Sequence, residues 1–280
     1  MERHSHMDLV KMDIYPGYVA RMVGFFHGPG GRLLVFLASF FLGFPVHAVD
    51  FVNILSDREA VTVGMLRESY DYHLDAAGRM VSTHTERMLT SADLDRLAHR
   101  WSTATVARFE YTYVRHGKTT TVVYHAISGR EANQILDIPI ADMSTFYGTG
   151  GASRPALIGP AKGSRLAVPE AGHVIDAEVK ALRTIEEGIL AGELPQGGRL
   201  RAWVSQPVCS SCKGVISSFE VAYGVRTTIN QWGISDELVA DSPFRQLSNH
   251  RRRGSSRLRQ WRRSSDRVQD SRRILSGCLP

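Results

Sequence analysis

The 280-residue sequence predicts an α/β fold, and two stretches of the chain carry this prediction. Residues 107–114 and 119–124 are rich in β-branched and aromatic residues and flank His116-Gly117, which predicts a β-hairpin with a tight turn. Residues 176–232 then follow the order helix, strand, helix, strand. A hydrophobic content of 43% with 22% charged residues is ordinary for a globular domain and excludes disorder for the middle of the chain.

Composition divides the chain into four segments. We expect a leader at residues 1–48, an N-terminal extension at 49–104, a catalytic domain at 105–240 and an arginine-rich, disordered tail at 241–280. The length between leader and tail suits one catalytic domain with an extension before it. The sequence has no internal repeat.

The leader has the order of a secretory signal peptide. Arg32 precedes an apolar run at 33–42, in which Ser39 is the only polar residue, and Val-His-Ala at 46–48 fits a signal-peptidase site. The run is too short to span a bilayer core of ~30 Å. We therefore expect a secreted protein that starts near Val49 and has no stable membrane span after cleavage. A buried helix or a short membrane anchor is the alternative.

The formal net charge of +6 originates at the C-terminal end. Residues 245–280 contain eleven arginines, no lysine and two aspartates, which gives +9, so the other 244 residues carry −3. An acidic body argues against tight binding of duplex nucleic acid. Because the arginine-rich segment shows little apolar periodicity, we expect a solvated or disordered tail, although such a segment could also grip phosphates.

Three local patterns lie before the second half of the chain. Residues 90–101 predict a capped helix with an apolar stripe. Ser128 and Glu131 have the spacing of a capping box that opens a short helix ending at Leu136. Residues 147–163 are dense in glycine, serine and proline and predict a loop.

The elements of the second half follow in close succession. From Asp176 the apolar residues recur at helical spacing as far as Ile189, and residues 199–205 alternate like a strand. Residues 214–223 again have helical spacing, and residues 225–232 predict a last strand. A candidate metal ligand stands at the start of each of the two helices.

The candidate ligands suit one zinc ion. Cys209 and Cys212, at the start of a helix, can bind Zn²⁺ from the same side, and the helix N-terminus helps to keep the thiolates ionised. Asp176 is the preferred third ligand, which leaves a fourth position for water. Glu178 is then placed to take a proton from that water and pass it to the leaving group. His173 is the alternative third ligand, or else it faces the substrate.

Asp-Ala-Glu at 176–178 and Pro-Val-Cys-Ser-Ser-Cys at 207–212 resemble the signature of the cytidine-deaminase superfamily, H-x-E followed by P-C-x-x-C. The Glu-x-Lys helix and the Cys-Ser-Ser-Cys turn are most similar to the deaminases of bacterial polymorphic toxins and secreted effectors. The resemblance covers about residues 105–232. Asp176 stands where the family has His or Cys, and the proline lies one residue further from the first cysteine than is common.

The resemblance implies a deaminase-like three-layer α/β/α core with a mixed sheet and zinc ligands at the N-termini of two helices. It implies that Cys209 and Cys212 bind Zn²⁺ and that Glu178 is the catalytic proton shuttle. A zinc-bound hydroxide then attacks a base carbon and ammonia leaves, with cytosine to uracil favoured. The substrate is a nucleic acid or a nucleotide, and the toxin context implies a cognate immunity protein as a partner.

Two other function classes remain open at this stage. The chain could be a secreted zinc hydrolase of another kind, or a non-catalytic binding module with a structural cysteine pair. Cys209 and Cys212 could form a disulfide or redox pair, and Asp176 could be a simple helix N-cap. The third cysteine is Cys278, so a four-cysteine zinc site is excluded.

Overall fold

The structure is a computed structural model of the chain. It describes residues 49–54, 59–83, 89–141, 143–147, 153–157, 159–232, 246–254, 256–258, 260 and 261. The predicted leader, residues 1–48, and Cys278 lie outside the described residues, which begin at Val49. Within the described part of the chain, no helix has the length and apolar character needed to cross a membrane.

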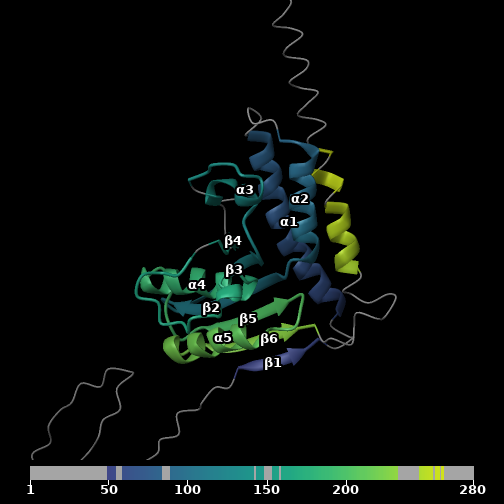
Figure 1. Cartoon of the computed structure of the whole chain (residues 1–280). Helices are drawn as coiled ribbons and strands as arrows, with labels where there is room; N and C mark the ends of the chain where they lie inside the picture. Colours follow the sequence, from purple (N-terminus) through teal and green to yellow (C-terminus); the bar gives the residue numbers. More distant parts are fainter. Residues whose placement is uncertain are drawn as a thin grey trace, which may run out of the picture. The chain divides into compact units, whose positions relative to one another are not determined.

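Six strands form one mixed sheet in the order β1-β6-β5-β2-β3-β4 (Figure 1). The strands are β1 (Asp50–Asn53), β2 (Val106–Arg115), β3 (Lys118–Ile127), β4 (Ser153–Pro155), β5 (Arg199–Val204) and β6 (Arg226–Gln231). The α-helices are α1 (Glu59–Thr83), α2 (Ser91–Thr103), α3 (Ala132–Ile135), α4 (Ala177–Leu190) and α5 (Ser210–Tyr223), and the 3-10 helices are η2 (Met143–Phe146) and η3 (Ala171–His173). The predicted α/β class with a mixed sheet is confirmed.

The hairpin of β2 and β3 forms as predicted. Arg115 pairs with Lys118, so the turn consists of His116 and Gly117. Both turn residues have positive φ, 51° and 73°, the pattern of the two-residue turn whose twist matches that of the strands. On its other side β2 pairs antiparallel with β5, and β5 pairs parallel with β6 through the crossover helix α5.

The two faces of the sheet carry different helices. Ala107, Phe109 and Tyr111 of β2 join a buried cluster with α4 and α5. Val106, of opposite pleat, joins a second cluster with α1 and α2. The alternation places a layer of helices on each face, because successive side chains of a strand point to opposite sides. The finer assignment to a deaminase-like core remains a proposal.

Residues 49–104 belong to the same compact unit as the rest of the described chain. Strand β1 pairs parallel with β6, with Asp50 opposite Thr228, and helix α1 packs over β2 and β3. The predicted boundary at residue 104 therefore lies inside a unit that extends from His47 to the C-terminus.

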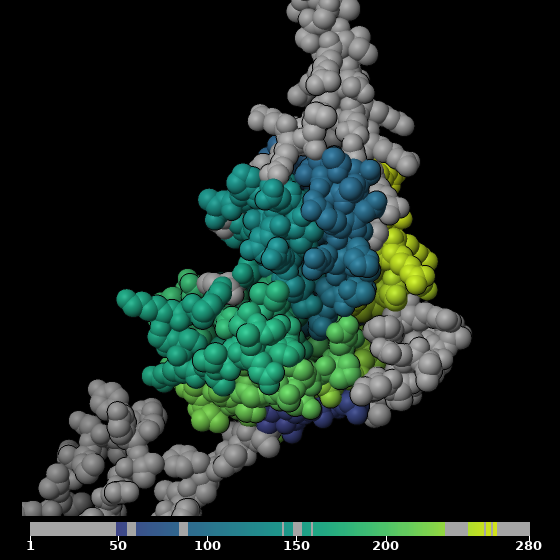
Figure 2. Space-filling model, in the orientation of Figure 1, coloured from purple at the N-terminus to yellow at the C-terminus, as the bar shows by residue number. Residues whose placement is uncertain are grey.

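The described part of the C-terminal tail is helical, which departs from the disorder expected there. Residues 246–254, 256–258 and 260–261 are in helix and lie against α1 and α2 (Figures 1 and 2). Leu247 and Leu258 are buried, and Gly254 allows close approach, since a Cβ there would lie 2.8 Å from Cε1 of Tyr70. The packed face is a helical stripe that reads Leu247, Arg251, Gly254, Leu258, Trp261.

Arg251 is buried in this contact and ties the tail to the sheet. Its guanidinium donates to the Ser205 hydroxyl at 3.1 Å and to the Ser102 carbonyl at 3.3 Å. The Tyr70 hydroxyl donates to the Arg251 carbonyl at 3.4 Å. Burial lowers the pKa of Arg251 to about 10, so the side chain stays charged at neutral pH.

Two smaller expectations also need correction. Ser128 does not cap α3, because its hydroxyl accepts a hydrogen bond from the Thr105 N–H at 2.8 Å. The N-cap is Glu131, paired with Gln134 in a capping box. The predicted loop at 147–163 contains β4, which pairs parallel with β3.

The tail contact predicts a large stability difference between two substitutions. Leu258→Ala removes a fully buried side chain and should lower the free energy of unfolding by about 2–5 kcal/mol. Arg253→Ala, on the exposed face of the same helix, should change it by no more than about 0.5 kcal/mol. Urea unfolding of both variants checks this. Equal, small effects would mean that the helix does not pack on α1.

Two buried histidines predict acid sensitivity. Burial lowers the pKa of His125 to about 4 and that of His73 well below its usual range. The unfolded chain takes up these protons near pH 6.5 and the folded chain does not, so stability is complete above pH 6.5 and falls as the pH decreases towards 4. His125 alone should contribute a loss of about 2 kcal/mol between pH 7 and pH 5.

Urea unfolding of His125→Gln at both pH values measures this contribution as a smaller pH dependence than that of the parent protein. His99→Gln, on the exposed face of α2, is the matched control and should keep the parent's pH dependence. A parent protein equally stable at pH 7 and pH 5 would contradict the prediction.

Candidate metal centre

Sheet topology brings two helix N-termini together. Helix α4 leads into β5 through a short turn, and α5 leaves β5 at its other end, so both helices run antiparallel to β5. They pack against each other on one face of the sheet, and their first residues lie at the same edge. The chemically active residues of the predicted site stand at these two starts.

Cys209 and Cys212 open helix α5. Cys209 is the N-cap, and its Sγ accepts a hydrogen bond from the Cys212 N–H at 3.2 Å. Both cysteines are free thiols, so the disulfide alternative is not what the structure contains. Cys212 is buried and Cys209 is half-buried, which keeps one face of the pair open to solvent.

Asp176 is the N-cap residue of α4, but its carboxylate does not cap the helix. Its Oδ2 instead accepts a hydrogen bond from His173 Nδ1 at 2.7 Å and lies 3.2 Å from Cys212 Sγ. The same oxygen lies 3.9 Å from Cys209 Sγ. A simple N-cap would turn its oxygen to the N–H groups of the first turn, so the carboxylate is oriented by the cysteine pair and the histidine.

Four donor atoms meet at this point. One atom each from His173, Asp176, Cys209 and Cys212 lies within 4.8 Å of the others, and His173 Nδ1 is 3.6 Å from Cys209 Sγ. Two sulfurs, one nitrogen and one oxygen at these separations could hold a metal ion. The structure thus brings together every ligand that the sequence predicted, including both candidates for the third position.

Glu178 lies one position inside the helix and is almost fully buried. Burial raises the pKa of its carboxyl to about 7, and the nearby Asp176 carboxylate acts in the same direction. Among the described residues, the only hydrogen bond to this carboxyl is donated by its own N–H. By contrast Glu186, two turns later, accepts bonds from Ser164, Arg165 and Tyr223. Glu186 therefore has a structural role. The Glu178 carboxyl has no such set of partners among the described residues, so it could take part in proton transfer.

Two effects oppose each other at the Cys212 thiol. The helix N-terminus favours the thiolate, whereas burial raises the pKa of this thiol well above its usual range, and the neighbouring Glu178 and Asp176 carboxylates raise it further. In contrast, the hydrogen bond to Asp176 raises the pKa of His173.

A buried lysine, to which the sequence analysis gave no role, fixes helix α4 at the site. The Lys180 ammonium donates to the carbonyls of Ile127 and Gly129, at 2.9 and 3.3 Å, and forms a buried ion pair with Glu131. The loop after β3 is thereby joined to the first turn of α4. The sequence signal that could have indicated this buried ion pair is a single lysine on the apolar face of the predicted helix.

Comparisons with protein-family models, with curated proteins and with solved structures gave no match to this chain.

The donor cluster predicts that the protein binds one metal ion through its cysteine pair. Cys209→Ser and Cys212→Ser should each lower the metal content of the purified protein severalfold, because a neutral hydroxyl replaces a thiolate ligand. Cys278→Ser is the control and should leave the metal content unchanged. Elemental analysis with a thiol assay measures both. A metal-free protein with a disulfide between Cys209 and Cys212 would exclude the site.

Proposed function

We propose that this chain is a zinc-dependent hydrolytic deaminase of a nucleobase, with cytosine to uracil favoured. The observation that carries the proposal is the meeting of Asp176, Cys209 and Cys212 beside the buried, unshared carboxyl of Glu178. The Asp176 carboxylate does not cap its own helix and lies instead against a cysteine pair. Packing alone does not require this arrangement. A proton-transfer group next to three ligands is what a hydrolytic metal site needs.

Zinc is the metal that fits the donor set. Two thiols with one carboxylate or imidazole match the ligands that zinc takes in tetrahedral sites. Asp176, Cys209 and Cys212 would hold the ion and leave one position open. When bound, zinc would supply the Lewis acidity that makes water a nucleophile at neutral pH.

Glu178 would handle both proton transfers. Its carboxylate would accept one proton from the attacking water and pass it to the ring nitrogen next to the attacked carbon. It would then take the second proton from the hydroxyl now on that carbon and pass it to the amino nitrogen, which leaves as ammonia while the oxygen becomes a carbonyl. Burial of Glu178 keeps bulk water from competing for the proton.

His173 has a different role in this proposal. Its Nδ1 donates to Asp176 Oδ2, which orients the carboxylate as outer partners of metal ligands do. If His173 also bound zinc, four protein ligands would close the site, and the centre would be structural. His173→Gln should therefore keep zinc, whereas Asp176→Ala should lose it, as elemental analysis of the two variants can measure.

Glu178→Gln should keep zinc and the fold but lower ammonia release by about 10²- to 10⁴-fold, the usual contribution of general acid–base catalysis. Glu187→Gln, on the exposed face of the same helix, is the matched control and should keep full activity. The measurement is ammonia release from zinc-loaded protein on a panel of nucleotides and single-stranded oligonucleotides.

Two outcomes would favour the alternatives. Zinc without ammonia release on any nucleobase would favour a secreted zinc hydrolase of another kind. Neither zinc nor activity would favour a non-catalytic binding module. Secretion, a toxin or effector role and a cognate immunity protein stay predictions of the sequence, because the leader lies outside the described residues.

A further inference from the structure

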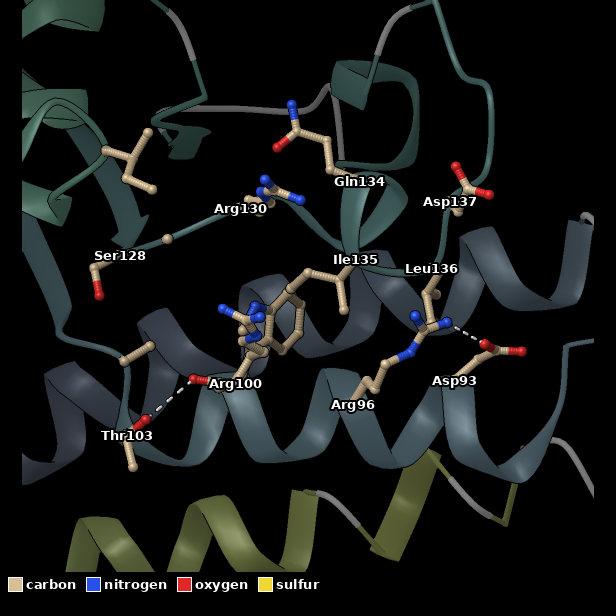
Figure 3. A pocket seen from close by; sticks show the side chains of 14 residues that line it. Asp93, Arg96, Arg100, Thr103, Ser128, Arg130, Gln134, Ile135, Leu136 and Asp137 are labelled. Carbon is tan, nitrogen blue, oxygen red and sulfur yellow. Dashed lines mark hydrogen bonds and ion pairs between the residues drawn. The ribbon is translucent and has the colours of Figure 1, made fainter. Parts of the chain in front are cut away.

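A cavity of about 650 Å³ extends to Ile175, next in the chain to the metal centre. Its walls are α2, the loop after β3, helix α3 and Ile175, the residue that precedes the ligand Asp176. Figure 3 shows Arg96 and Arg100 on α2 and Arg130 on the loop, on opposite sides of the cavity. The volume lies within the ~300–1,000 Å³ of sites that hold small organic groups.

The lining of the cavity is positively charged. Arg96, Arg100 and Arg130 oppose Asp93 and Asp137, a net charge of +1. Arg96 is paired with Asp93. Within the described part of the chain, Arg100 and Arg130 have no carboxylate partner, and both are exposed. Two guanidinium groups without an internal partner face each other across the cavity, where their donors suit phosphate oxygens.

The cavity and the metal centre share a wall. The Gly129 N–H donates to the Ile175 carbonyl at 2.9 Å, and the Gly129 carbonyl accepts from Lys180 of α4. Arg130 follows Gly129, which is hydrogen-bonded both to Ile175 and to the start of α4. Ile175 lines the cavity, and the next residue, Asp176, belongs to the donor cluster. A substrate group in the cavity would lie next to a base held at the metal centre.

We propose that this cavity binds the phosphodiester backbone, with a neighbouring nucleotide, of a single-stranded nucleic acid whose target base sits at the metal centre. The inference rests on the proposed function and narrows its substrate from nucleotides in general to a polynucleotide. The cavity has room for more than one phosphate group, and its two unpaired arginines come from two different elements. A free base or nucleoside would leave this charge unused.

Arginines of the C-terminal helix are the rival source of phosphate attraction. Arg252 and Arg253 are exposed on that helix, and neither lines the cavity between α2 and α3. They supply the same charge away from that cavity. Substituting two arginines at each place therefore separates a built site from general attraction.

The test is binding of a fluorescein-labelled, mixed-sequence 12-nucleotide DNA strand to the zinc-loaded full chain, followed by anisotropy over a range of salt concentrations. Arg100→Gln with Arg130→Gln should weaken binding at least fivefold at low salt. The slope of log K against log salt should fall by about 1.4, since each lost phosphate contact on a single strand contributes ~0.7. Arg252→Gln with Arg253→Gln should change affinity less than twofold.

A second measurement separates the two kinds of substrate. Ammonia release from the oligonucleotide should fall at least fivefold in the Arg100→Gln, Arg130→Gln protein, and release from cytidine monophosphate should change less than twofold. Equal losses on both substrates would overturn the polynucleotide assignment. Thermal unfolding of the double variant, expected to match that of the parent, excludes a loss of fold.

These measurements distinguish a failure of the cavity proposal from a failure of the proposed deaminase activity. Oligonucleotide binding that is insensitive to Arg100 and Arg130 overturns the cavity, whether or not ammonia is released. Loss of binding in the cavity variant without ammonia release by the parent protein supports the cavity as a nucleic-acid site and counts against the deaminase instead.

Discussion

The packing of α4 against α5 on one face of the sheet is the contact on which the candidate metal centre depends. Because β5 and β6 are parallel, α5 must return along the sheet between them, and it therefore starts at the end of β5 where α4 also starts. The buried Lys180–Glu131 pair then fixes α4 lengthwise by tying it to the end of β3. Removing one partner of such a pair leaves a buried charge uncompensated, at a cost of about 3–5 kcal/mol. Backbone geometry and one buried ion pair thus set the positions of the two helices that carry the donor atoms.

Local patterns in the sequence were sufficient for the elements of residues 176–232 and for the hairpin turn. Helical spacing, strand alternation and a His116-Gly117 turn are properties of neighbouring residues, and each appears where it was expected. The pairing of β1 with β6 is a property of residues far apart in sequence, so no local pattern marked it. The prediction of a disordered C-terminal tail was wrong for another reason. Its packed stripe has an arginine and a glycine among its apolar positions, and the many exposed arginines hide the remaining periodicity.

For the site, the ligand types could be predicted and their mutual geometry could not. Spacing to Glu178 favoured Asp176 over His173, because Asp-x-Glu matches H-x-E and His173 lies five residues before Glu178. The 3-10 turn η3 brings both residues into the cluster, since His173 Nδ1 lies 2.7 Å from Asp176 Oδ2. The pKa of the Cys212 thiol also could not be predicted from the sequence. A helix N-terminus favours a thiolate, but burial and the two adjacent carboxylates raise the pKa of this thiol, and both depend on the tertiary structure.

The pairing of β1 with β6 places Asp50 opposite Thr228. It joins the first and the last strand of the described sheet in sequence. A contact of this span closes a very long loop, and such closures slow folding even when the final state is stable. Until β1 arrives, the outer edge of β6 offers unpaired backbone groups to any other extended chain. A chain in which β1 has not yet paired would therefore expose β6, the strand next to β5, to misassociation.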